Sequence, residues 1–147
     1  MEEKIIVGWR EYVDFPEWDI HKLRAKIDTG AHTSSLHVED VTLLTHNRIR
    51  FYVVLRKKNI IYKKKVITQR IKTGHVKSST GIKTKRWYVQ TRLKIGEFEK
   101  NIVVNLVNRE GMNFRMLLGR NALDETFLVD VSRSFLLHKR KKRQGVT

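Results

Sequence analysis

The sequence predicts an all-β domain with one short helix near its C-terminal end. Apolar and polar residues alternate in many short segments, which is the two-residue period of a strand with one buried face. Residues 57–59 and 96–98 separate pairs of such segments and contain the Asn or Gly of a tight turn, so we expect hairpins there. With 147 residues the chain is long enough for one domain with its own core, which we place at residues 1–138.

The elements expected in the first half of the chain follow from local patterns. The only proline, Pro16, interrupts the apolar alternation and predicts a loop. The run of imidazole and hydroxyl side chains after Gly30 predicts a polar loop along one wall of a cleft. In order, the expected elements are a short strand at 5–13 that turns near Gly8, a loop at 14–17, a strand at 23–27, the polar loop at 32–37, a strand at 38–44 and a hairpin at 48–71.

The second half is expected to contain two further hairpins and the helix. From residue 72 to 86 the apolar pattern is lost, and Gly74 and Gly81 bracket a polar segment that we interpret as a mobile lid or as a plain surface loop. In order, the expected elements are this segment, a hairpin of strands 87–95 and 99–107, a polar turn at 108–113, a strand at 116–118, a helix soon after Gly119, a closing hairpin of 127–131 and 134–137, and a disordered basic tail at 139–147.

The candidate functional residues are Asp28, Thr29 and Gly30. Alternating apolar residues precede them and predict a strand, and Gly30 permits the positive φ of a sharp turn at its end. Asp28 therefore stands where a rigid strand meets a loop, a position at which catalytic side chains are held still. The triplet also suits an ordinary turn, so a second signal is needed. Residues 116–123 supply it, since an apolar strand there ends in Gly119-Arg120-Asn121.

Net charge is the strongest signal in the composition. The chain carries 31 Lys and Arg against 15 Asp and Glu, which gives +16 at pH 7 and a pI near 10.4. Such a field attracts anionic partners, and nucleic acid, an anionic membrane and an acidic polypeptide all remain candidates. There is no cysteine, and the charged N-terminus does not read as a secretory signal, so a cytoplasmic protein without disulfides is expected.

Taken together, the motifs resemble the retropepsin-like aspartic proteases. The full set is most similar to the family known as ATP-dependent zinc proteases, which includes RimB and is associated with RimK-type ATP-grasp ligases that add glutamates to protein tails. The resemblance runs from residue 8 to about 137. The matching pieces are residues 8–11, 25–37, 76–81, 108–112 and 115–123.

The resemblance implies a closed β-barrel lobe that acts as a homodimer with two facing Asp-Thr-Gly turns. Asp28 and its symmetry mate would share a proton, one acting as base toward water and the other as acid toward the scissile carbonyl. Thr29 would hydrogen-bond across the dimer, and Gly30 would let a backbone donor and the substrate approach the carboxylate. The residues expected to bind substrate are Ala31, His32, Lys77, Ser78, Ser79 and Arg120.

Two departures from the family pattern are visible. Retroviral enzymes have an acidic residue at the place of His32, where it meets the arginine that corresponds to Arg120, so the role of Arg120 is open. The family name also implies zinc and ATP, but His32 and His37 do not have metal-ligand spacing, and no Walker loop is present. We therefore expect no metal and no cofactor.

Two functions from different classes follow from these features. The first is an aspartic peptidase that cleaves acidic peptides, such as glutamate-tailed ones, with a RimK-type ligase or the ribosome as partner and no membrane. The second is a non-catalytic module that binds RNA or a ribosomal partner. Its cations would be at 57–58, at 63–65 and in the tail, with Tyr52, Tyr62 and Trp87 available to stack on bases. A carboxylate at Asp28 would repel phosphates, which favours the peptidase.

Overall fold

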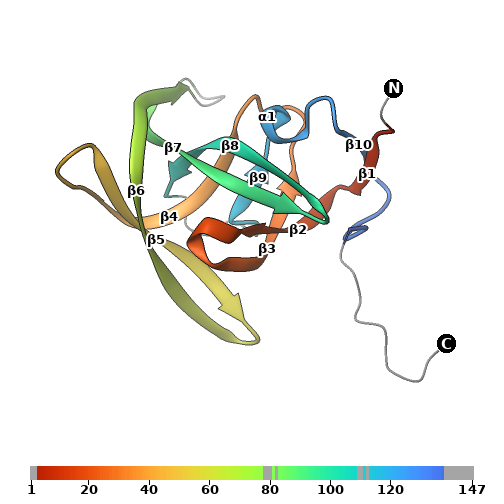
Figure 1. Cartoon of the computed structure of the whole chain (residues 1–147), viewed down its shortest axis with the longest axis horizontal. Helices are drawn as coiled ribbons and strands as arrows, with labels where there is room; N and C mark the ends of the chain where they lie inside the picture. Colours follow the sequence, from red (N-terminus) through yellow and green to blue (C-terminus); the bar gives the residue numbers. More distant parts are fainter. Residues whose placement is uncertain (1–2, 78–80, 82, 109–110, 112, 138–147) are drawn as a thin grey trace.

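The computed structural model describes residues 3–77, 81, 83–108, 111 and 113–137, and these residues form an all-β fold with one short α-helix (Figure 1). The strands are β1 (Ile5–Gly8), β2 (Arg10–Phe15), β3 (Ile20–Ile27), β4 (Ser34–Leu43), β5 (Arg48–Lys57), β6 (Ile60–Lys77), β7 (Lys83–Ile95), β8 (Phe98–Val107), β9 (Met116–Leu118) and β10 (Phe127–Asp130), with a 3-10 helix at Pro16–Trp18 and the helix α1 at Arg120–Leu123. In the part of the chain described, no helix is long and apolar enough to cross a membrane.

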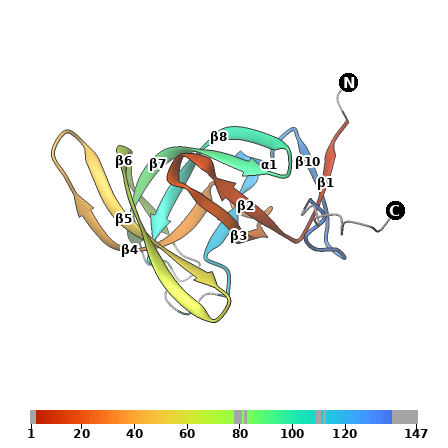
Figure 2. The ribbon, with the colours of Figure 1, turned by 60° about the horizontal axis from the view of Figure 1, so that its bottom comes forward.

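Strand pairing runs in a ring. The main sheet has the order β2-β3-β9-β4-β5-β6-β7-β8, and the additional pairings β2–β7 and β4–β8 connect it back on itself. Residues Asp14 and Lys94 pair where β2 meets β7, while β4 runs parallel to β8 over residues 34–37. β1 and β10 form a separate parallel pair at one end of the molecule, and the β5–β6 hairpin lies toward the other (Figures 1 and 2).

The core is filled by the apolar residues that the alternation predicts. In β3, Leu23, Ala25 and Ile27 are buried while the residues between them are exposed. Three aromatic rings form a chain across the interior, with centroids 5.1 Å apart for Phe15 and Trp18 and 5.4 Å apart for Trp18 and Phe51. Offset and edge contacts of this kind add to the free energy gained from burial alone. The core therefore supports β3, the strand that ends directly before Asp28.

Two expected loops are strands. The polar loop expected at 32–37 is wrong from Ser34 onward, because β4 begins there and buries Leu36 and His37 between β8 and β9. The segment expected to form a lid at 72–86 is also largely paired, since residues 72–77 of β6 oppose residues 83–88 of β7. Residues 78–80 and 82, at the centre of that expected lid, lie outside the described part of the chain.

The expected closing hairpin is wrong as well. Residues 127–130 form β10, but β10 pairs in parallel with β1 at the other end of the sequence. Residues 134–137 form no strand and are instead fixed to the segment around Gly8. A Cβ at Gly8 would lie 2.3 Å from the carbonyl oxygen of Arg133, so the two segments approach each other more closely than any side chain permits. The basic tail at 139–147 lies outside the described residues.

The side chain of Glu11 joins the two ends of the described chain. It is fully buried, and its carboxylate accepts hydrogen bonds from the N–H groups of Gly8 at 2.7 Å, Leu136 at 3.0 Å and Leu137 at 3.2 Å. A buried carboxylate is tolerated only when such donors replace its lost water. The motif at residues 8–11 is therefore a clamp on the C-terminal segment, a structural role that the sequence did not assign to it.

We predict that Glu11→Gln lowers the free energy of unfolding by about 3 kcal/mol, because the amide nitrogen would face N–H donors and leave at least one of them without an acceptor. Urea denaturation followed by fluorescence measures the loss. The control is Asp124→Asn, which makes the same chemical change at an exposed position. Equal unfolding midpoints for Glu11→Gln and Asp124→Asn would contradict the clamp.

Candidate functional site

Asp28 lies at the start of a tight turn, residues 28–31, which we call the Asp28 turn. Its N–H donates to the carbonyl of Leu118 at 2.8 Å, which continues the parallel pairing of β3 with β9 by one residue. The N–H of Gly30 donates to Oδ1 of Asp28 at 3.1 Å, and the N–H of Ala31 donates to the Asp28 carbonyl at 3.2 Å. The half-buried carboxylate is thus oriented by its own turn.

The expected conformation of Gly30 is wrong. The glycines with positive φ among the described residues are Gly81, Gly96 and Gly111, so Gly30 does not adopt the left-handed region. A Cβ at Gly30 would meet only Oδ1 of Asp28, at 3.4 Å, which is ordinary contact. The physical reason for the glycine is access: a missing side chain leaves space beside the carboxylate.

The Gly119 segment, residues 119–121, packs against the Asp28 turn and its continuation. The N–H of Arg120 donates to the carbonyl of Ala31 at 2.8 Å, and the N–H of Asn121 donates to the carbonyl of His32 at 3.1 Å. A Cβ at Gly119 would lie 2.3 Å from the Thr33 carbonyl oxygen, so this contact requires glycine. The two sequence motifs therefore form one hydrogen-bonded unit.

Arg120 has a partner within the same chain. Its guanidinium donates to the carbonyl of Thr29 at 3.2 Å, directly after Asp28. The Arg120 guanidinium is therefore held without the carboxylate that retroviral enzymes have at the position of His32. Both Arg120 and His32 are exposed. They lie next to the Asp28 turn, which itself contains Thr29 and Ala31. Of the remaining residues expected to bind substrate, Lys77 is the last residue of β6, and the structure does not describe its side chain. Ser78 and Ser79 lie outside the described residues.

A buried polar network behind the turn was missed by the sequence interpretation. Asn105 on β8 is 1% exposed, and its side chain donates to Thr33 Oγ1 at 3.1 Å and to the Ser34 carbonyl at 2.9 Å. It also accepts from Ser35 Oγ and from Arg86, both at 2.8 Å. The signal was available, because Asn105 is the one polar residue in the apolar run 102–107.

Asn121 and Ser34 complete this support. Ser34 Oγ accepts from the N–H of Gly119 at 3.1 Å and donates to Asn121 Oδ1 at 2.8 Å, while Asn121 Nδ2 donates to the Val103 carbonyl at 2.8 Å. Each buried polar atom named here has a partner, which is the condition for a network to rigidify a site rather than weaken it.

The histidines that the family name would assign to zinc lie in different environments. His32 is exposed beside the Asp28 turn, whereas His37 is buried on β4 with Nε2 3.9 Å from Glu39. Glu39 itself pairs with Lys63 at 2.7 Å, and this ammonium lowers the pKa of Glu39. Over the described ranges, no group of three His, Asp or Glu side chains is arranged to hold a metal ion.

The fold and the paired motifs define a retropepsin-like protein. The profile of the family described as "Retropepsin-like aspartic endopeptidase RimB" matches residues 6–140, and the chain belongs to this RimB-like family.

Relatives and a solved structure agree with this placement. The chain is 32% identical over 143 residues to a "Probable alpha-L-glutamate ligase" of Shewanella halifaxensis and 33% identical over 134 residues to one of Desulfotalea psychrophila, which covers 92% and 86% of this chain. The matched regions are 30% and 28% of those relatives, so the chain spans under a third of their length. A crystal structure of Lpg0085, a protein of unknown function from Legionella pneumophila, matches with a TM-score of 0.73 and 30% identity over 92% of this chain and 100% of that one.

We predict that Gly119→Ala and Gly30→Ala differ sharply in stability. The first forces a methyl group into the Thr33 backbone and should cost about 3 kcal/mol, while the second meets only a side-chain oxygen and should change stability by less than about 1 kcal/mol. Thermal and urea denaturation of the two variants measure the difference. If Gly119→Ala unfolds like the wild type, the close contact between the motifs is not a structural requirement.

Proposed function

We propose that the protein is an aspartic-type peptidase whose catalytic pair is Asp28 and the same residue of a second copy in a homodimer. The observation that carries the proposal is the orientation of Asp28 by the Gly30 N–H, within a turn that the Gly119 segment holds in place. The retropepsin-like family supports the same chemistry. Because one chain contains one Asp-Thr-Gly, the second carboxylate comes from a partner.

The reaction follows from the charge of such a pair. Two carboxylates in contact cannot both ionise cheaply, so they hold one proton between them. The ionised Asp28 takes a proton from water, the protonated one donates to the carbonyl oxygen of the scissile bond, and a tetrahedral intermediate forms. As the intermediate collapses, the protonated carboxyl group donates its proton to the leaving nitrogen, the ionised one takes a proton from a hydroxyl group of the intermediate, and the C–N bond breaks, so that the pair again holds one proton. Gly30 donates to the carboxylate throughout.

The substrate class we propose is an acidic peptide, such as a glutamate-tailed protein. A chain of net charge +16 attracts such substrates, and the relatives that contain a similar region are named for glutamate ligation. His32, Arg120, Lys77, Ser78 and Ser79 are the proposed contacts of substrate carboxylates and backbone. The proposed setting is the cytoplasm, with a RimK-type ligase or the ribosome as partner.

We predict that the wild-type protein cleaves a glutamate-tailed peptide, that a glutamine-tailed peptide of equal length is cleaved poorly, and that Asp28→Asn lowers the rate by about 10³-fold or more. Mass spectrometry of the products measures this, with EDTA present in a parallel series. Asp124→Asn, at an exposed position, is the matched control and should retain full activity. Equal rates for Asp28→Asn and wild type would overturn the proposal, and loss of activity in EDTA alone would make the peptidase metal-dependent.

A shared site also predicts dependence on protein concentration. Dilution below the dissociation constant of the dimer should lower the activity per chain, because each half-site lacks its second carboxylate. Adding excess Asp28→Asn chains to a fixed amount of wild type should lower activity further by forming mixed dimers with one aspartate. Sedimentation velocity at the same concentrations checks the dimer. Activity per chain that is constant across a monomeric range would refute the paired site.

A further inference from the structure

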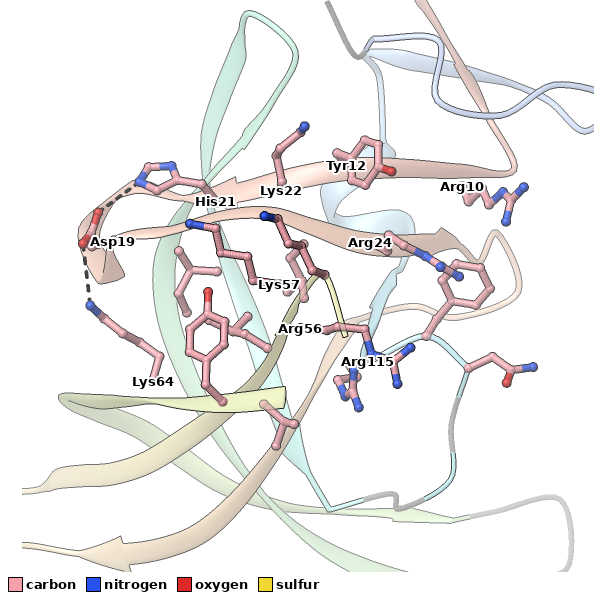
Figure 3. Close-up of a pocket in the computed structure, with 18 of the residues that line it drawn as sticks. Arg10, Tyr12, Asp19, His21, Lys22, Arg24, Arg56, Lys57, Lys64 and Arg115 are labelled. Atoms are coloured by element: carbon pink, nitrogen blue, oxygen red, sulfur yellow. Dashed lines mark hydrogen bonds and ion pairs between the residues drawn. The ribbon is translucent and has the colours of Figure 1, made fainter. Parts of the chain in front are cut away.

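A groove of about 1290 Å³ opens on the molecule, and Asp28 does not line it. Its walls come from β2 and β3, from the β5–β6 hairpin and from residues 113–115 before β9 (Figure 3). Among the described residues, nineteen line the groove; eight of them are Lys or Arg, and one, Asp19, is a carboxylate. Figure 3 shows Lys57 directed from the end of β5 toward β3, and Arg56 directed toward Arg115. We call this site the basic groove.

The one carboxylate of the basic groove is already neutralised. Asp19 Oδ1 lies 3.0 Å from Nε2 of His21, and Oδ2 lies 3.6 Å from Nζ of Lys64. These two partners lower the pKa of Asp19, so it stays ionised and satisfied. Across the described ranges, no other Lys or Arg of the groove forms an ion pair with a carboxylate. The groove therefore holds a strong excess of positive charge.

Three of the four aromatic rings among the described lining residues of the groove hold cations in place. The guanidinium of Arg10 lies 4.6 Å from the ring centre of Trp9, that of Arg24 lies 4.9 Å from Phe114, and the Lys22 ammonium lies 5.7 Å from Tyr12. These three faces are occupied by the protein's own cations, and Tyr62, which is 44% exposed, is the remaining ring of the groove. One such ring against eight cations favours recognition by charge over base stacking, and Arg forks match carboxylates in geometry.

The basic groove shares a strand with the candidate catalytic residue. In β3 the buried residues alternate with exposed ones, so Arg24, Lys26 and Asp28 follow one another on the same side. At roughly 3.3 Å per residue, Arg24 lies about 13 Å along the strand from Asp28. An extended peptide of about four residues spans that distance.

We propose that the basic groove is a docking site for an acidic run of a polypeptide substrate, whose side-chain carboxylates bind Arg24, Arg56, Lys57 and Arg115 at a distance from the cleaved bond. The identity of the bound chain as a substrate rests on the proposed peptidase function. Binding itself does not require catalysis, so the two can be tested separately. The expected ligand has several consecutive carboxylates in an extended chain.

Fluorescence anisotropy with labelled octaglutamate tests the proposal, using the full chain with Asp28→Asn to prevent cleavage. In this background we compare Arg24→Gln/Lys57→Gln, within the groove, with Arg48→Gln/Lys65→Gln, outside it. Both pairs remove the same charge, so only location differs. The groove pair should weaken binding about tenfold, and the control pair less than about twofold. Equal losses would overturn the proposal by showing a diffuse charge effect.

A variant that makes the groove more positive should strengthen the binding of an acidic peptide. Asp19→Asn removes the one carboxylate among the described lining residues and releases Lys64, while asparagine tolerates the left-handed backbone at φ 52°. Octaglutamate should then bind about twofold to threefold more tightly. A labelled U8 RNA is measured in parallel. Tighter binding of RNA than of octaglutamate, lost only in the groove pair, would overturn the proposal and assign the groove to nucleic acid.

Steady-state kinetics of peptide cleavage tests the docking site and the peptidase activity independently. With Asp28 intact, the groove pair should raise KM about tenfold for a peptide with a long acidic extension and leave kcat unchanged, since it removes uniform binding. A peptide without the extension should be unaffected. If the wild type cleaves nothing but the octaglutamate results hold, the docking site stands and the peptidase fails. If cleavage occurs and KM does not respond to the groove pair, the docking site fails and the peptidase stands.

Discussion

The close contact between the Asp28 turn and the Gly119 segment is the constraint on which the rest of the site depends. The backbone of Gly119 approaches Thr33 so closely that no side chain fits, and the N–H groups of Arg120 and Asn121 then donate to the following loop. This contact joins β3, β9 and β4, which are neighbours in the strand ring. An aspartate at the end of an unsupported strand would move with its loop. Asp28 is instead held by contacts between backbone atoms, which are less mobile than contacts between side chains.

Support for the site extends inward through polar groups whose hydrogen bonds are satisfied. Asn105 donates from β8 to the carbonyl of Ser34, which follows the turn. Asn121 on α1 accepts from the Ser34 hydroxyl and donates to the Val103 carbonyl on β8, so both amides satisfy buried backbone carbonyls that water does not reach. Glu11 likewise satisfies buried backbone groups, because its carboxylate accepts hydrogen bonds from N–H groups of the C-terminal segment. Ionic and amide side chains at these places contribute little net free energy of folding, but their removal leaves donors unpaired, so they specify one arrangement.

The strands and the short helix were predictable from the sequence because alternation and turn residues are local properties. The same approach identified Asp28 and Gly119, since both end apolar strands. It failed at Ser34 and His37, where polar side chains are buried because their partners come from β8, β9 and α1, which are distant in sequence. It failed again at residues 134–137, which read as a strand but satisfy their N–H groups on Glu11. The expected roles of the motifs came from the family resemblance. The structure alone showed that residues 8–11 act as a clamp on the C-terminal segment.

In the proposed catalytic pair one negative charge stays on the two Asp28 carboxylates, and this charge would repel an acidic ligand. The order of residues along β3 offers a physical solution. Lys26 stands two residues before Asp28, about 7 Å along the strand and within the screening length of about 8 Å at physiological salt, so it offsets the repulsion locally. Arg24, about 13 Å away, lies beyond that length and acts on a ligand only by direct contact. In the proposed docking mode, the cations of the basic groove would therefore bind an acidic chain without altering the charge at Asp28. The strength of binding would then be separate from the chemistry of the proposed catalytic pair.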